Sequence, residues 1–112
     1  MVDSKYVPKT GDLVWVSFKS NQGHEQKGRR PALVVSPEYY NDKVGLALMC
    51  PVTSKQKGYS FEVKLNSKKV KGVVLADHVR SLDWRVKEVE FIEEVSEKVI
   101  KETRDKITLL IR

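Results

Sequence analysis

Residues 28–36 read GRRPALVVS and residues 51–54 read PVTS, and these two stretches decide the fold expected of the chain. The run from Arg30 to Ser36 is almost continuously apolar, which is typical of a strand buried on both faces. Proline is tolerated as the first residue of a strand, so Arg30 stands where this strand begins. The next expected strand covers residues 45–53 and ends at Thr53. Two successive strands therefore each carry a polar side chain at one end.

The sequence around these stretches predicts more strands and one helix. Apolar patterns bounded by turn residues predict strands at residues 13–18, 61–65, 73–80 and 86–92. The segment from Pro37 to Asp42 has turn chemistry and is expected to end the strand before it. Ser96 is an expected N-cap, and apolar residues beyond it recur at three- and four-residue spacing. We therefore expect an α+β fold, mainly β, whose C-terminal helix covers one face of the sheet.

Length and charge limit the classes of protein to consider. The 112 residues suit a single domain spanning residues 1–112. The chain has 21 Lys and Arg against 15 Asp and Glu, a net charge of +6, and residues 1–85 hold 15 basic and 8 acidic side chains. A basic surface attracts polyanions, so RNA, DNA, acidic protein segments and anionic membranes are all candidate partners. Charge alone does not choose among them.

Several features that the sequence lacks narrow the function further. Cys50 is the only cysteine and lies in an apolar run, which favours a buried thiol over a nucleophile. No signal-peptide pattern and no run long enough to span a bilayer occur, so a cytoplasmic protein with no membrane partner is expected. There is no phosphate loop ending in Lys-Ser/Thr, no Cys or His pair at zinc spacing and no serine elbow. No metal and no nucleotide cofactor is expected.

Arg30 and Thr53 together suit the binding of a phosphate. A guanidinium offers five donors in a rigid fork, and a nearby hydroxyl adds one more, so both can converge on the non-bridging oxygens of a phosphodiester. Either residue also has an ordinary structural explanation. An arginine at a strand end often forms a surface ion pair, and threonine suits strands for steric reasons alone. Both interpretations of the pair stay open on spacing alone.

Four blocks of sequence carry a family resemblance. GDLVWV (residues 11–16), RPALVVSP (30–37), PVTS (51–54) and VVLADHV (73–79) occur in this order. With them the chain resembles the MazF/PemK-type toxins from about Tyr6 to its C-terminus. The resemblance implies an SH3-like small barrel of the CcdB/PemK/MazF type, usually a homodimer. It also implies a sequence-specific, metal-independent endoribonuclease, or mRNA interferase, that cuts single-stranded mRNA and is silenced by a cognate antitoxin.

The resemblance also assigns catalytic roles to individual residues. The family's catalytic arginine falls on Arg30, which would stabilise the charge of the transition state. Its catalytic threonine falls on Thr53, which would hydrogen-bond the scissile phosphate. Glu25, in the loop after the first strand, corresponds to a glutamate near the family's site and would accept the proton of the 2′-hydroxyl. Asp77 matches an aspartate to which plasmid-borne relatives give an acid-base role, although an aspartate near a strand end is as often a turn or cap residue.

Other side chains are candidates for binding the RNA outside the cleaved bond. Arg29 forms a doublet with Arg30 and would bind a neighbouring phosphate or lie in solvent. Tyr59 or Phe61 would stack on an unpaired base. Lysines in the expected loops would follow the RNA backbone and make binding salt-sensitive; the candidates are Lys55, Lys57, Lys68 and Lys69.

The two histidines of the chain offer an alternative chemistry. Imidazole titrates near neutral pH, so His24 and His78 could by themselves run acid-base cleavage of RNA. The family motif requires neither of them. Histidines in such positions more often lie in a loop or on the surface without a catalytic role.

The partners expected from the resemblance are an RNA and a protein. A MazE-like antitoxin would bind through an acidic segment that folds into the basic groove and covers Arg30, and DNA binding would occur only through the antitoxin complex. The family leaves a 2′,3′-cyclic phosphate and a 5′-hydroxyl at the cut. Two other functions stay open: a CcdB-like poison of DNA gyrase with no nuclease activity, and a small-barrel RNA-binding module that never cuts.

Overall fold

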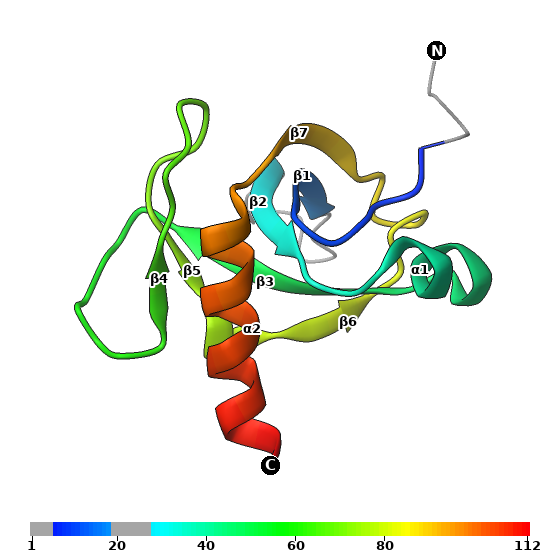
Figure 1. Cartoon of the computed structure of the whole chain (residues 1–112). Helices are drawn as coiled ribbons and strands as arrows, with labels where there is room; N and C mark the ends of the chain where they lie inside the picture. Colours follow the sequence, from blue (N-terminus) through cyan, green and yellow to red (C-terminus); the bar gives the residue numbers. More distant parts are fainter. Residues whose placement is uncertain (1–5, 19–27) are drawn as a thin grey trace.

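The computed structural model describes residues 6–18 and 28–112 (Figure 1). Within this part the chain forms a curved antiparallel sheet and two α-helices. The strands are β1 (Asp12–Phe18), β2 (Gly28–Val34), β3 (Ala47–Thr53), β4 (Glu62–Lys64), β5 (Val73–Leu75), β6 (Arg80–Leu82) and β7 (Glu90–Glu94). The helices are α1 (Glu38–Val44), α2 (Glu97–Ile111) and the short 3₁₀ turn η1 (Ala76–His78). The expected class, mainly β with a C-terminal helix, is confirmed.

Strand β3 is the centre of the sheet. The strands follow the order β4-β5-β3-β2-β1-β7, and β6 also pairs with β3. The first half of β3 pairs with β6, where Met49 lies opposite Arg80, and its last residues pair with β5, where Thr53 lies opposite Val73. All of these pairings are antiparallel. One strand thus connects three neighbours, and its C-terminal end carries Thr53.

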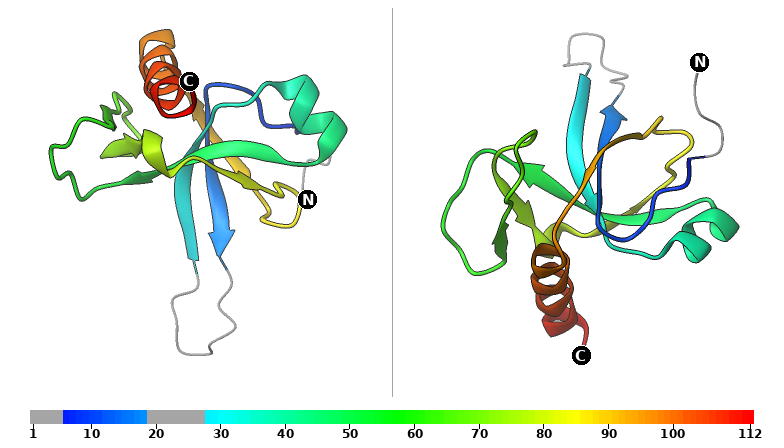
Figure 2. Two further views of the ribbon diagram at one scale, coloured as in Figure 1. Left: turned by 90° about the horizontal axis from the view of Figure 1, so that it is seen from below. Right: turned by 45° about the horizontal axis from the view of Figure 1, so that its top comes forward.

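The alternating side chains of the strands fill two cores, one on each face of the sheet. The first core includes Leu13, Leu33, Cys50, Val74 and Val99, and α2 covers it. The second core lies on the other face; it is formed by Val14, Val16, Ala32, Val34, Ala47, Met49, Leu82 and Trp84. Figure 2 shows α2 on one side of the sheet while β1 and β2 extend away from it on the other. Helix α2 therefore leaves the face of the second core uncovered.

Helix α2 begins where the sequence predicts. Ser96 is its N-cap, and the Ser96 Oγ accepts a hydrogen bond from the Val99 N–H at 3.3 Å. Val99 and Thr103 are buried, and the partly buried Ile100 and Ile107 pack against the first core. The predicted amphipathic helix and its role of covering the sheet are both confirmed.

The strand β2 ends before Pro37, as predicted, but the turn predicted at Pro37 to Asp42 is wrong. Residues 38–44 form the helix α1 instead. The reason lies in the buried side chain of Asn41, whose Nδ2 donates to the Pro8 carbonyl at 2.8 Å and whose Oδ1 accepts from the Ser36 hydroxyl at 2.6 Å. The Trp84 indole N–H donates to the Asn41 carbonyl at 2.9 Å. Pro8 and Trp84 are distant from Asn41 in sequence, so tertiary contacts stabilise a helix that local turn residues do not predict.

Two predicted strands also differ from the structure. Residues 73–80 do not form one strand, because η1 separates β5 from β6. The strand predicted at 86–92 begins only at Glu90, since residues 83–89 form a turn. The Asp83 carboxylate caps this turn by accepting from the N–H groups of Arg85 and Val86, both at 3.1 Å, and Glu88 has a positive φ of 50°. Capping by one aspartate overrides the β-forming tendency of the valines.

Candidate active site

A groove opens over the uncovered face of the sheet. Its volume is about 310 Å³. Its floor is apolar and overlaps the second core, and its polar lining comes from four different elements, β2, β3, η1 and β6. The lining residues are Val16, Arg30, Pro31, Ala32, Met49, Pro51, Val52, Thr53, Leu75, His78, Arg80 and Leu82. Strands far apart in sequence therefore meet around one concave surface.

The groove brings Arg30 and Thr53 together, as the sequence predicts. Ala32 of β2 lies opposite Pro51 of β3, and extending this register by two residues places Arg30 opposite Thr53; both residues line the groove. Among the described residues no carboxylate forms an ion pair with the Arg30 guanidinium. The Thr53 Oγ1 accepts a hydrogen bond from the Lys55 N–H at 3.1 Å, which leaves the hydroxyl proton to donate elsewhere. Both groups can therefore donate to one anion in the groove.

Gly72 packs against the C-terminal end of β3. Its φ is +130°, and a Cβ built on it would lie 2.1 Å from the Thr53 carbonyl oxygen. The neighbouring Val73 pairs with Thr53 across the β3–β5 ladder. The backbone of residue 72 thus packs directly on that of Thr53, and only glycine allows this approach.

Asp77 lies beside the groove rather than among the residues that line it. Its Oδ1 accepts a hydrogen bond from the Tyr59 hydroxyl at 2.8 Å and lies 3.9 Å from the His78 Nε2. The hydrogen bond to Asp77 is the largest cause that raises the pKa of Tyr59. Tyr59, predicted to stack on a base, is thus tied to Asp77 through its hydroxyl, and the acid-base role predicted for Asp77 stays a prediction.

Arg29 is not brought together with Arg30. Successive side chains of a strand point to opposite faces, and Arg29 forms an ion pair with Glu90 of β7 and lies over the Trp15 ring at 5.3 Å. The arginine doublet of the sequence is therefore split across the sheet. The RNA contact predicted for Arg29 would have to be made away from this groove.

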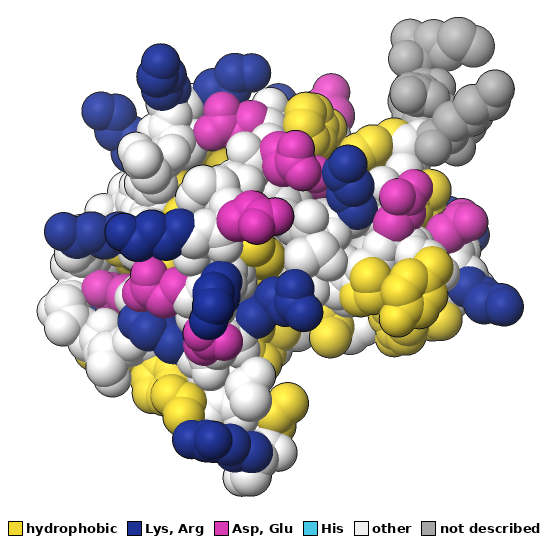
Figure 3. Space-filling view, in the orientation of Figure 1, with side chains coloured by type: hydrophobic (Ala, Val, Ile, Leu, Met, Phe, Trp, Pro, Cys, Tyr) yellow, Lys and Arg dark blue, Asp and Glu magenta, His cyan; other side chains and the backbone are white. Residues whose placement is uncertain are grey.

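The four predicted RNA-binding lysines lie in two loops outside the groove. Lys55 and Lys57 belong to the loop that follows Thr53, which is anchored because the Glu62 carboxylate accepts from the N–H groups of Lys57 and Gly58 at 2.8 and 2.9 Å. Lys68 and Lys69 belong to the loop between β4 and β5, and the Lys69 ammonium donates to the Ile92 carbonyl at 3.4 Å. Figure 3 shows Lys and Arg side chains around these loops, with Asp and Glu side chains among them. The contacts predicted between these lysines and RNA stay predictions.

The structure adds one groove residue that the sequence reasoning missed and leaves two predicted residues undescribed. Arg80 of β6 lines the groove and stands opposite Met49. The sequence does carry a signal for Arg80, since it stands at the end of an apolar run, as Arg30 does. Residues 73–80 were interpreted as one continuous strand, so Arg80 was not placed beside Arg30 and Thr53. Glu25 and His24 lie outside the described residues.

Cys50 is a structural thiol, as predicted. It is fully buried, and burial raises its pKa to about 12, so the thiolate does not form near neutral pH. In the described part of the chain no group of three His, Cys, Asp or Glu side chains is arranged to hold a metal ion. Within the same residues no helix is long and apolar enough to cross a membrane.

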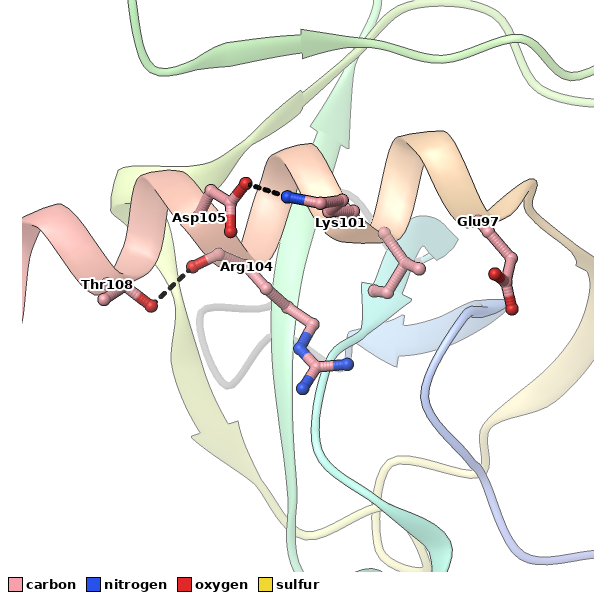
Figure 4. A pocket seen from close by; sticks show the side chains of 6 residues that line it. Glu97, Lys101, Arg104, Asp105 and Thr108 are labelled. Carbon is pink, nitrogen blue, oxygen red and sulfur yellow. Dashed lines mark hydrogen bonds and ion pairs between the residues drawn. The ribbon is translucent and has the colours of Figure 1, made fainter.

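A second hollow, on the exposed face of α2, differs in character from the groove. Its volume is about 410 Å³. Figure 4 shows its charged side chains, of which the Lys101 ammonium donates to the Asp105 carboxylate at 2.8 Å. The Thr108 hydroxyl donates to the Arg104 carbonyl at 2.9 Å. Its polar groups largely satisfy one another along a single helix, so the groove is the stronger candidate for chemistry.

Comparison with known proteins identifies relatives of the chain. The family model described as the PemK-like, MazF-like toxin of type II toxin–antitoxin systems matches residues 9–111. The chain is 51% identical to the endoribonuclease toxin MazF of Escherichia coli K12 over 84 residues, which cover 75% of this chain and 76% of that protein. It is 35% identical to the endoribonuclease toxin ChpB of the same strain over 98 residues, or 82% of this chain and 84% of ChpB.

Solved structures give the same result. A crystal structure of MazE–MazF from Deinococcus radiodurans superposes with a TM-score of 0.90 at 54% identity, covering 95% of this chain and 96% of the matched chain. An endoribonuclease from a mycobacterial species shares the fold at 17% identity, with a TM-score of 0.74 over 96% of this chain and 93% of the matched chain. The chain therefore belongs to the PemK-like, MazF-like toxins of type II toxin–antitoxin systems.

Proposed function

We propose that this chain is a toxin endoribonuclease that cuts single-stranded mRNA in the groove between β2, β3 and β6. The observation that carries the proposal is the meeting of Arg30 and Thr53, from two strands, on one basic concave surface. The relatives named endoribonuclease toxins, among them MazF of Escherichia coli, support the reaction class. Cleavage of cellular messages would arrest translation and growth.

The proposed reaction uses the substrate's own 2′-hydroxyl as the nucleophile. Attack on the adjacent phosphorus concentrates negative charge on the non-bridging oxygens, which the Arg30 guanidinium stabilises through paired N–H donors. The Thr53 hydroxyl donates to one of the same oxygens, because its acceptor side is already occupied by the Lys55 N–H. The products are a 2′,3′-cyclic phosphate and a 5′-hydroxyl. This chemistry needs no metal ion.

The substrate is proposed to extend from the groove toward the lysine loops. Lys55 and Lys57 directly follow Thr53 in the chain, so a strand of RNA bound at Thr53 passes close to them. Contacts of this kind are with phosphates and carry no base information. Binding is therefore expected to weaken steeply as the salt concentration rises.

The proposed partner is a cognate antitoxin. Solved relatives include MazE–MazF complexes from Deinococcus radiodurans, at 50–54% identity to this chain. An acidic antitoxin segment that folds on binding would lie on the basic groove and block access to Arg30. We further propose that residues 1–112 form one domain, that the toxin acts as a homodimer in the cytoplasm, and that DNA is bound only through the antitoxin complex.

Incubation of the purified protein with a long single-stranded RNA in excess EDTA, with the fragment ends mapped, tests the proposal. Discrete cuts are expected from the wild type, and Arg30→Ala and Thr53→Ala are expected to lose about 100-fold or more of the cleavage rate. Arg104→Ala is the matched control, because it removes an exposed arginine from α2, which packs on the other face of the sheet. Circular dichroism shows whether each variant is folded.

The two rival functions predict different results. If the RNA stays intact while expression in cells still stops growth, the gyrase-poison function is correct. If the RNA is bound but not cut, the protein is an RNA-binding module. If all three variants cut like the wild type, the nuclease site lies elsewhere.

A further inference from the structure

We propose that His78 is the general acid of the reaction, which protonates the 5′-oxygen of the leaving nucleotide. The inference rests on the proposed function and names the proton donor for the same groove. His78 comes from η1, between β5 and β6, and it lines the groove together with Arg30 and Thr53. The roles given to Arg30 and Thr53 stabilise charge on the non-bridging oxygens and leave the departing oxygen without a proton source.

The composition of the groove singles out this residue. Eight of its twelve lining residues are apolar or proline, and the other four are Arg30, Thr53, His78 and Arg80. Arginine keeps its protons throughout the range in which proteins are stable, and an alcohol such as Thr53 is a very weak acid. Imidazole alone among these side chains gains and loses a proton near neutral pH. Among the described lining residues, His78 is thus the one suited to proton transfer.

Asp77 and Tyr59 lie next to the His78 ring. The Asp77 Oδ1 lies 3.9 Å from the His78 Nε2, which is within ion-pair distance of an imidazolium. The Tyr59 hydroxyl donates to this same oxygen at 2.8 Å and so fixes the carboxylate next to the ring. Asp77 is therefore a positioning residue, because its carboxylate lies next to the ring and is itself held by Tyr59.

Bond formation and bond cleavage at phosphorus are coupled in the proposed step. The bond from the 2′-oxygen to phosphorus forms while the bond from phosphorus to the 5′-oxygen breaks. The His78 imidazolium gives its proton to the 5′-oxygen, which leaves as a hydroxyl, and the proton of the 2′-hydroxyl passes to water. The neutral imidazole then takes a proton from water, and no oxidant or reductant is involved.

A substrate with a sulfur leaving group tests this role directly. A thiolate leaves without protonation, so replacing the 5′-bridging oxygen at a mapped cleavage site by sulfur removes the need for an acid. His78→Gln is expected to cut the normal oligonucleotide at least 100-fold more slowly than the wild type. On the sulfur substrate the two proteins are expected to differ by less than about threefold. Thr53→Ala, which removes phosphate stabilisation, should be slow on both substrates.

Each result separates this inference from the proposed function. If the wild type cuts neither substrate, the proposed function itself is wrong. If the wild type cuts the normal substrate and His78→Gln cuts it equally fast, His78 is not the acid although the nuclease function stands. An equal loss by His78→Gln on both substrates also overturns the inference, because it assigns the histidine to binding or to phosphate stabilisation.

The role of Asp77 is tested with the same two substrates. Asp77→Asn keeps the size of the side chain but removes the carboxylate that lies next to the His78 ring. It is expected to slow cleavage of the normal oligonucleotide by about tenfold and to cut the sulfur substrate within about threefold of the wild-type rate. Tyr59→Phe, which removes the hydrogen bond to Asp77 and keeps the ring, should show the same pattern with a smaller loss. An equal loss on both substrates in Asp77→Asn would contradict the positioning role.

Discussion

Replacing Gly72 by alanine should damage the active site without touching a functional side chain. A Cβ at this position would lie 2.1 Å from the Thr53 carbonyl oxygen and 2.7 Å from the Thr53 carbonyl carbon, whereas real Cβ atoms essentially never come within 3.0 Å of another atom. The obstacle is backbone, which cannot rotate away. The ends of β3 and β5 therefore have to separate by about 1 Å.

The expected loss of stability has two parts. A φ of +130° in a residue with a side chain costs about 1–3 kcal/mol. Forcing an extra methyl group against packed backbone costs about 1–3 kcal/mol more. A total of about 4 kcal/mol corresponds to a fall in Tm of roughly 15 °C for a domain of this size. Cleavage should fall as well, because the displaced backbone is that of Thr53.

Gly58→Ala is the matched control for this prediction. Gly58 also has a positive φ, +88°, but nothing lies within 4 Å of a Cβ built on it. It should therefore show only the conformational part, about 1–2 kcal/mol. Thermal unfolding of the three proteins, followed by circular dichroism, gives the comparison. A Tm for Gly72→Ala no lower than that of Gly58→Ala would refute the argument that backbone contact positions Thr53.

Three further predictions concern other parts of the fold. Arg29→Ala should change the cleavage rate by less than about threefold and the stability by less than about 1 kcal/mol, because its pair with Glu90 is exposed and lies away from the groove; a 100-fold slower cleavage would contradict this. Ser96→Ala should lower the free energy of unfolding by about 1 kcal/mol through loss of the N-cap of α2, measured by urea denaturation. Because burial raises the pKa of Cys50 to about 12, iodoacetamide at pH 8 should alkylate it only after unfolding, and rapid labelling of the native protein would show otherwise.

The elements whose signal is local could be predicted from the sequence. Alternating and continuous apolar runs placed β1 to β4 within a few residues, and the serine N-cap with its amphipathic pattern placed α2. Helix α1 could not be predicted in this way. It depends on Asn41, whose partners Pro8 and Trp84 are distant in the chain. Long-range hydrogen bonds leave no periodic pattern in the sequence.

The site could be predicted in part. Arg30 and Thr53 were identified because each ends an apolar strand, and the strand register then brings them together. Arg29 was grouped with Arg30 because the two are adjacent in the sequence. Adjacent side chains on a strand point to opposite faces, so Arg29 pairs with Glu90 instead of lining the groove. Arg80 and His78 reach the groove only because η1 turns the chain between β5 and β6, and that turn was not foreseen.

The residues that line the groove are spread over most of the chain, and this determines when the protein can become active. Its polar lining comes from β2, β3, η1 and β6, and β1 pairs with β7 near the other end of the chain. A polypeptide still being synthesised, or one that has lost β6, has no complete groove. Nuclease activity is thus expected only from chains that have been synthesised and folded through β6.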